Sequence, residues 1–107
     1  MKQAEVERFI LELSGGKADT TSEPGLNLFK NQNGKIFAVI QEGSDPLRID
    51  AKCDVRLAKH LREKYETVLP SKTMEAATWN EIICAGQLTD EEVCDLLRLS
   101  YEIVGAS

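Results

Sequence analysis

Residues 26–52, LNLFKNQNGKIFAVIQEGSDPLRIDAK, decide the fold of this chain, because they read as three strands joined by two short turns. Asn33-Gly34 lies in the first turn, and an Asn-Gly pair accepts the positive φ angles that tight hairpins require. Residues 35–41 are apolar on both faces, as in a central strand, and residues 47–52 alternate apolar with charged side chains. The third strand is predicted to turn Leu47, Ile49 and Ala51 inward, and Arg48, Asp50 and Lys52 outward.

The segment before these strands is predicted to hold one helix and one loop. Residues 6, 9, 10 and 13 are apolar and recur with helical spacing. Gly15-Gly16 then ends the helix, because glycine tolerates the left-handed conformation that closes helix ends. Residues 17–25 are polar and contain a Pro-Gly turn signal, so they are predicted to form a loop.

The segment after the three strands is predicted to form a helix, two short strands and a closing helix. Asp54 is suited to cap the first of these helices, which ends before Pro70. Residues 70–74 are predicted to form a short strand and residues 78–86 a better one. Thr89 followed by Glu92 has the spacing of a capping box. The buried faces of the two helices are predicted to be Leu57, Ala58, Leu61, Tyr65 and Val68, and Val93, Leu96, Leu97, Ser100 and Val104.

These elements predict one α+β domain over residues 1–107. It would be a two-layer α-β(3)-α-β(2)-α arrangement, with an antiparallel sheet and helices packed on one face. The composition, 42% hydrophobic and 29% charged, is ordinary for a globular protein. No apolar run approaches the roughly 20 residues that span a bilayer, and the N-terminus does not read as a signal peptide. A cytoplasmic location is therefore predicted, with Cys53, Cys84 and Cys94 as reduced thiols.

Catalytic and metal-binding patterns are poorly represented, so the chain is predicted not to be an enzyme and to carry no cofactor. The single histidine, His60, is read as a surface residue rather than a catalytic base. Cys84 and Cys94 are ten residues apart and have no CxxC partner, which argues against structural zinc. The acidic cluster invites a cation site, but its place at a helix N-terminus favours a dipole role. That cluster is Asp90, Glu91, Glu92 and Asp95.

Charge is unevenly distributed along the chain. Residues 1–65 carry 11 Lys/Arg against 10 Asp/Glu, whereas residues 66–107 carry two against eight. A basic row on the second helix, Lys52, Arg56 and Lys59 with Arg62 beside it, has a spacing that suits contacts to phosphates. Glu63 interrupts the row, and a solvated helix face of mixed charge gives the same pattern. Trp79 has two readings as well, base stacking or burial, of which burial in the core is favoured.

Residues 52–104, from KCDVRLAKHLREKYETVLPSKTM through TWNEIICAG to LSYEIV, resemble the MmcQ/YjbR family. The likeness rests on an AxxLR helix, a VLPSxxM segment, a Trp before a strand that ends in glycine, and a closing SYxxV helix. The framework residues that match are Pro70, Met74, Trp79, Ser100 and Tyr101. The resemblance implies a bacterial protein with a fold similar to frataxin (CyaY) and to secretion chaperones. It also implies DNA binding, for which a double-wing mode has been proposed.

The segment before Trp79 departs from the family pattern. Thr73 and Thr78 stand where the family typically has histidines, and Glu75 and Ala76 replace an Asn-Lys pair. Lys72 is the basic residue that remains there. The predicted DNA contacts are therefore Lys52, Arg56, Lys59 and Lys72, and DNA binding is expected to be weak in a chain of net charge −5.

Two alternatives to DNA binding remain. One is a protein-interaction or chaperone-like module that uses the acidic C-terminal helix or the sheet face. The other is frataxin-like metal binding, here of iron, by the acidic cluster.

Overall fold

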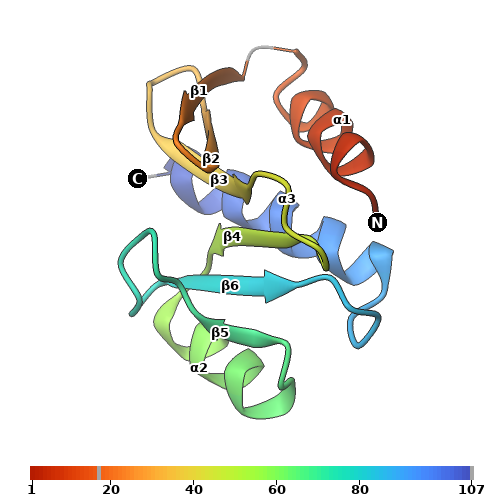
Figure 1. Cartoon of the computed structure of the whole chain (residues 1–107). Coiled ribbons are helices and arrows are strands. Elements are labelled where there is room, and N and C mark those ends of the chain that lie inside the picture. Colours follow the sequence, from red (N-terminus) through yellow and green to blue (C-terminus); the bar gives the residue numbers. More distant parts are fainter. Residues whose placement is uncertain (17, 107) are drawn as a thin grey trace.

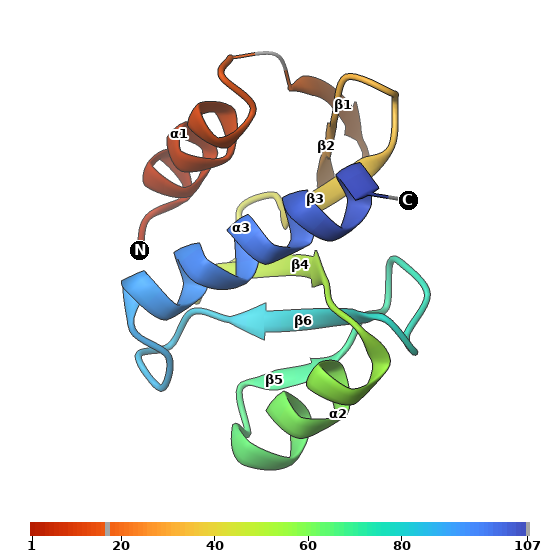
Figure 2. The same ribbon diagram turned by 180° about the vertical axis from the view of Figure 1, so that it is seen from behind.

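The computed structural model describes residues 1–16 and 18–106 and confirms the α+β class (Figure 1). Six antiparallel strands form one sheet in the order β1-β2-β3-β4-β6-β5. The helices lie on one face of it, and α3 crosses in front of the central strands in the view of Figure 2. The elements are α1 Gln3–Leu13, β1 Asp19–Glu23, β2 Leu26–Lys30, β3 Ile36–Gln41, β4 Arg48–Lys52, α2 Val55–Lys64, β5 Val68–Pro70, β6 Trp79–Ile83 and α3 Asp90–Ala106.

The loop predicted for residues 17–25 was wrong, because residues 19–23 form the edge strand β1. Its five residues pair antiparallel with β2, from Asp19 opposite Lys30 to Glu23 opposite Leu26. The strand is polar and largely exposed, so it shows no apolar alternation and its pairing stabilises it. The observed order is therefore α-β(4)-α-β(2)-α, with one strand more than predicted.

The strand predicted at residues 70–74 was also misplaced, because β5 spans Val68–Pro70. The helix α2 ends at Lys64, and Tyr65 has extended backbone angles, so Val68 belongs to β5 rather than to the helix. Pro70 is tolerated because β5 is an edge strand, where a missing N–H breaks no ladder. Residues 71–78 follow as an irregular connection to β6, which we call the strap.

The main hydrophobic core fills the space between the sheet and the helices. Val6 and Ile10 come from α1, and Val93, Leu97 and Val104 from α3, and all five are buried. In α2, Ala58 and Leu61 are buried and Leu57 is half-buried, as is Tyr65, which directly follows the helix. No helix in the described ranges is long and apolar enough to cross a membrane.

A serine hydroxyl closes each end of the β3–β4 ladder. The bulge at Phe37 interrupts the pairing of β3 at one end. There Ser100 of α3 donates to the Phe37 carbonyl at 2.6 Å and accepts from the Lys52 amide at 2.8 Å. At the other end Ser44 donates to the Gln41 carbonyl at 2.7 Å and accepts from the Arg48 amide at 2.9 Å. Each hydroxyl therefore replaces a ladder hydrogen bond between the two strands.

The predicted helix caps are confirmed. The Asp54 carboxylate accepts from the Leu57 amide at 3.0 Å and opens α2. At the start of α3, the Thr89 hydroxyl accepts from the Glu92 amide, and the Glu92 carboxylate accepts from the Thr89 amide. Local side-chain chemistry thus fixes where both helices begin.

Replacing Asp54 by alanine should lower the free energy of unfolding by about 1 kcal/mol, because the first turn of α2 loses its side-chain acceptor. Urea unfolding followed by circular dichroism measures the change. Asp54→Asn is the matched control, since the amide oxygen still accepts the Leu57 N–H and little stability should be lost. Equal losses in the two variants would assign the effect to charge rather than to the cap bond.

Candidate functional site

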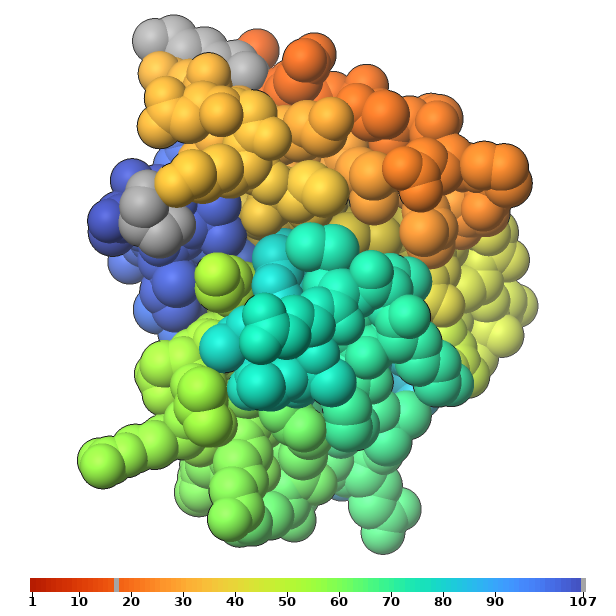
Figure 3. Space-filling model, turned by 90° about the vertical axis from the view of Figure 1, so that its left-hand side faces the viewer, coloured from red at the N-terminus to blue at the C-terminus, as the bar shows by residue number. Residues whose placement is uncertain are grey.

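The four predicted DNA contacts lie at one end of the molecule. Lys52 ends β4 and is half-buried, and Arg56 and Lys59 are exposed on α2. Lys72 is exposed on the strap, which lies against α2 in Figure 3. Two hydrogen bonds join the strap to α2 and to the residues that precede it. Arg62 Nη2 donates to the Ala76 carbonyl at 2.9 Å, and the Cys53 amide donates to the Thr78 carbonyl at 2.8 Å.

This end of the molecule is locally basic. Residues 52–64 carry five Lys/Arg against two Asp/Glu, in a chain whose net charge is −5. None of the four predicted contacts forms an ion pair within residues 1–16 and 18–106. Arg62 is different, because its guanidinium bonds to the Ala58 and Ala76 carbonyls. Arg62 therefore ties α2 to the strap, whereas the four predicted contacts remain available to meet an anion.

Trp79 is 4% exposed, which confirms the prediction that it is mostly buried. It opens β6 opposite Lys52, and strand alternation places it on the face away from the helices, with Glu81. Backbone bonds tie it to the strap: its amide donates to the Glu75 carbonyl, and its carbonyl accepts from the Ser71 amide. The indole is therefore framework beneath the strap and is not presented for base stacking.

The other framework residues have structural roles too. Met74 is half-buried in the strap, and its amide donates to Ser71 Oγ at 3.0 Å. Tyr101 packs edge-on against Phe37, with ring centroids 4.9 Å apart, next to the Ser100 bridge. These contacts hold the strap and α3 in place, and Tyr101 also lines a surface cavity of about 300 Å³ beside the β2–β3 turn.

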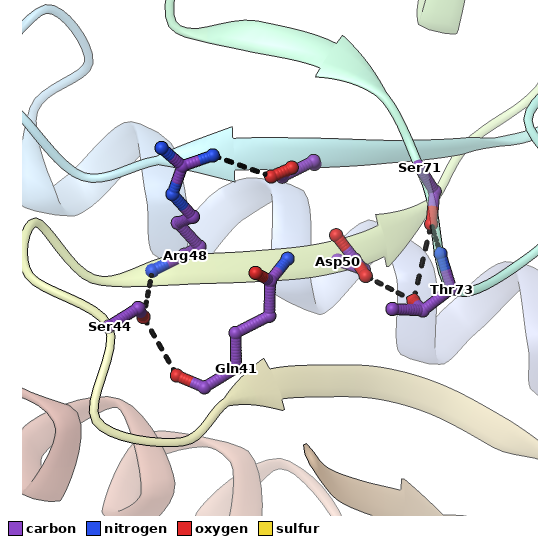
Figure 4. A network of polar contacts seen from close by, with 7 residues as sticks. Gln41, Ser44, Arg48, Asp50, Ser71 and Thr73 are labelled. Carbon is purple, nitrogen blue, oxygen red and sulfur yellow. Dashed lines mark hydrogen bonds and ion pairs between the residues drawn. The ribbon is translucent and has the colours of Figure 1, made fainter. Parts of the chain in front are cut away.

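Asp50 was predicted to face solvent, and this was wrong, because its exposed fraction is 0%. It does lie on the face away from the helices, directly opposite Glu81 of β6. The strap covers it there, and Thr73 Oγ1 donates to Asp50 Oδ2 (Figure 4). Arg48 Nη1 lies 3.0 Å from Glu81 Oε1, and the Glu81 side chain is 1% exposed. Glu81 was missed by the sequence reasoning, although a lone acid within the apolar strand 79–83 was a signal.

The environment of Asp50 favours its protonated form. Burial raises the pKa of Asp50, and the negative charge of Glu81 raises it further. The hydrogen bond from Thr73 and the nearby polar side chains of Ser71 and Gln41 lower this pKa and offset part of the rise. The Gln41 side chain points toward Asp50 in Figure 4.

Two acids of the predicted cation cluster form ion pairs within the protein. Asp90 Oδ1 lies 3.4 Å from the N-terminal amino group, and Asp95 Oδ1 lies 2.7 Å from Arg98 Nη1. No group of three or more His, Cys, Asp or Glu side chains in the described ranges is arranged to hold a metal ion. The only histidine, His60, is exposed on α2.

Cys53, Cys84 and Cys94 are free thiols in the structure. Burial raises the pKa of Cys53 to about 11. Burial likewise raises the pKa values of Cys84 and Cys94. A higher pKa lowers the thiolate fraction, which is the reactive form.

Comparison with known proteins gives a consistent answer for this chain. A family model described as YjbR matches residues 11–103. The curated protein named "Uncharacterized protein YjbR", found in two strains of Escherichia coli, is 28% identical over 67 residues. That alignment covers 63% of this chain and spans 57% of the length of the Escherichia coli protein.

Solved structures with low sequence identity share the fold. A protein from Deinococcus radiodurans with a DUF419 domain has a TM-score of 0.79 at 21% identity, covering 89% of this chain and 75% of its own. A protein from Pseudomonas syringae has a TM-score of 0.80 at 18% identity, covering 97% of this chain and 99% of its own. At these identities the likeness concerns the fold alone.

Proposed function

The chain belongs to the YjbR family, and on that premise we propose that it is a non-enzymatic binding domain that holds DNA weakly through phosphate contacts. The observation that carries the proposal is the basic end of the molecule, where Lys52, Arg56 and Lys59 stand without ion-pair partners in the described ranges. Lys72 on the adjoining strap adds a fourth cation. An overall net charge of −5 opposes DNA at long range and explains why the affinity should be weak.

The contacts expected from these side chains are to phosphates rather than to base edges. Ammonium and guanidinium groups that neutralise phosphates give affinity without sequence information. Four such contacts predict a slope of about −3.6 for log K against log salt, and so roughly a 100-fold loss of affinity between 50 and 200 mM salt. We therefore expect little preference among duplex sequences.

Charge reversal at Lys52, Arg56 and Lys59 should weaken DNA binding by at least about tenfold and remove most of its salt dependence, because three phosphate contacts are lost. Fluorescence anisotropy with labelled duplex and single-stranded DNA, at two salt concentrations, measures both quantities. The matched control reverses Lys2, Arg8 and Lys30, which changes the net charge equally but lies outside α2 and the strap. Unchanged affinity in the first variant, or equal losses in both, would rule out the basic row.

A second candidate is a protein-interaction surface, favoured by a groove between α2 and α3. Its cavity volume is about 190 Å³, its floor is apolar, and Glu92 and Asp95 line its edge. The apolar lining consists of Leu61, Tyr65, Leu88 and Leu96. A basic segment with one apolar side chain complements this groove. Neutralising Asp95 tests the groove itself, and neutralising Asp90 and Glu91 as well tests the whole acidic start of α3. A partner whose binding is unchanged in the triple variant would count against this surface.

A further inference from the structure

The strap (residues 71–78) covers two buried carboxyl groups that the proposed DNA surface does not use. Asp50 and Glu81 lie directly opposite each other on β4 and β6, with exposed fractions of 0% and 1%. One oxygen of each has a partner, which is Thr73 for Asp50 and Arg48 for Glu81. The other two oxygens, Asp50 Oδ1 and Glu81 Oε2, are buried and have no hydrogen-bond partner among the described residues.

The charges around this pair do not balance if both acids are ionised. Arg48 supplies one positive charge against two negative charges, and a buried uncompensated charge is costly. Lys52 lies two residues from Asp50 on β4, but it forms no ion pair with either acid in the described ranges. The neighbours from the other elements are uncharged, and the charged strap residues Lys72 and Glu75 are exposed. Those uncharged neighbours are Val39 and Gln41 of β3, Leu69 of β5, and Ser71 and Thr73 of the strap.

One shared proton removes both problems, the unbalanced charge and the two oxygens without a hydrogen-bond partner. A protonated carboxyl group is a donor as well as an acceptor, whereas an ionised one only accepts. Side chains directly opposite each other on antiparallel strands have Cβ atoms about 5 Å apart, which brings the two carboxyl groups within reach of each other. A proton on Asp50 Oδ1 donated to Glu81 Oε2 would give both orphaned oxygens a partner and leave Glu81 ionised beside Arg48. Two carboxyl groups that share a site behave in this way, because the second ionisation meets the charge of the first.

We propose that Asp50 and Glu81 hold one proton between them, and that this proton keeps the strap closed over the sheet. When the proton is lost to solvent, two like charges face each other beneath the strap and require hydration. The Thr73–Asp50 bond favours the ionised form and resists opening, but it satisfies only one of the four carboxylate oxygens. Water reaches the other oxygens when the strap opens, and the repulsion between the two charges drives that opening. Opening would also expose Trp79.

The sign of the pH effect follows from the direction of the pKa shift. Burial raises the pKa of Asp50 above its ordinary value of 3.8. A folded state that binds the proton more tightly than the unfolded chain is most favoured below that ordinary value. Its stability then declines as the pH rises through the raised pKa. The pair is thus a proton-sensitive latch that weakens toward higher pH.

The test compares the pH dependence of thermal unfolding in the wild type and in Asp50→Asn, whose amide donates to Glu81 at every pH and mimics the proton. Between about pH 4 and pH 8, the Tm of the wild type should fall relative to that of Asp50→Asn by about 4–8 °C. Asp95→Asn, the same change at an exposed acid, should run parallel to the wild type. Over the same range, wild-type Trp79 fluorescence should shift and the Thr73 and Met74 amides should exchange faster.

Three outcomes would overturn the latch. Parallel Tm profiles for the wild type and Asp50→Asn would do so, as would a wild-type Asp50 carboxyl that titrates by NMR at or below 3.8. The NMR titration uses the unmodified chain, so it decides the matter even if Asp50→Asn fails to fold. If calcium or magnesium stabilises the wild type but not Asp50→Asn, then a bound cation, not a proton, balances the two carboxylates. None of these readouts involves DNA, so they are independent of the proposed function.

Discussion

Replacing Arg48 by alanine is expected to lower the free energy of unfolding by about 3 kcal/mol, because the buried Glu81 carboxylate loses its counter-charge. Arg48 Nη1 lies 3.0 Å from Glu81 Oε1, and the side chains are 35% and 1% exposed. The partial exposure of Arg48 lets water reach the site, which places the loss at the low end of the range for buried pairs. Urea unfolding followed by circular dichroism measures it from the transition midpoint at a constant m value.

Arg98→Ala is the matched control for this prediction. Arg98 Nη1 lies even closer to its partner, 2.7 Å from Asp95 Oδ1, but the side chains are 49% and 63% exposed. An exposed pair of this kind contributes about 0–1 kcal/mol, so the two arginines should differ clearly despite similar geometry. Similar losses at both sites would show that burial of Glu81 does not decide the energetics.

The helices and the meander could be predicted because their signals are local. Asp54 and Thr89 act within three residues of themselves, and Asn33-Gly34 acts within one turn. Strand β1 was missed because its stability comes from pairing with β2, and a polar edge strand leaves no alternation to read. A signal was nevertheless present, since Pro24-Gly25 lies in the turn that joins β1 to β2.

The candidate site was predicted only where exposure follows from helical spacing. Arg56 and Lys59 are exposed as the helix pattern requires. Asp50 was assigned to the correct face of β4, but alternation does not say whether that face is open or covered. Asp50 is covered by Thr73, which is 23 residues away in the chain, and it is paired with Glu81 of β6, which is more distant in the sequence than Thr73. Contacts of that range depend on the path of the strap, which no local pattern specifies.

The β3–β4 bridges depend on distant contacts as well, and they give a second large effect. Ser100→Ala should lower the free energy of unfolding by about 3 kcal/mol, because the Phe37 carbonyl and the Lys52 amide both lose their partner. Ser100 is fully buried, so water has no ready access to replace the hydroxyl. Thermal and urea unfolding measure the loss, and retained secondary structure by circular dichroism shows that the variant is folded.

Ser44→Ala provides a control with the same bonding pattern, because its hydroxyl also donates to a β3 carbonyl and accepts from a β4 amide. Ser44 is only half-buried in its turn, so water can take over both bonds and the loss should be about 1 kcal/mol or less. The comparison separates the hydrogen bonds, which the two sites share, from burial, which they do not. If the two serines cost the same, the hydroxyl bonds themselves carry the effect. In that case a backbone group without a hydrogen-bond partner would lower the stability of this sheet whether or not water can reach it.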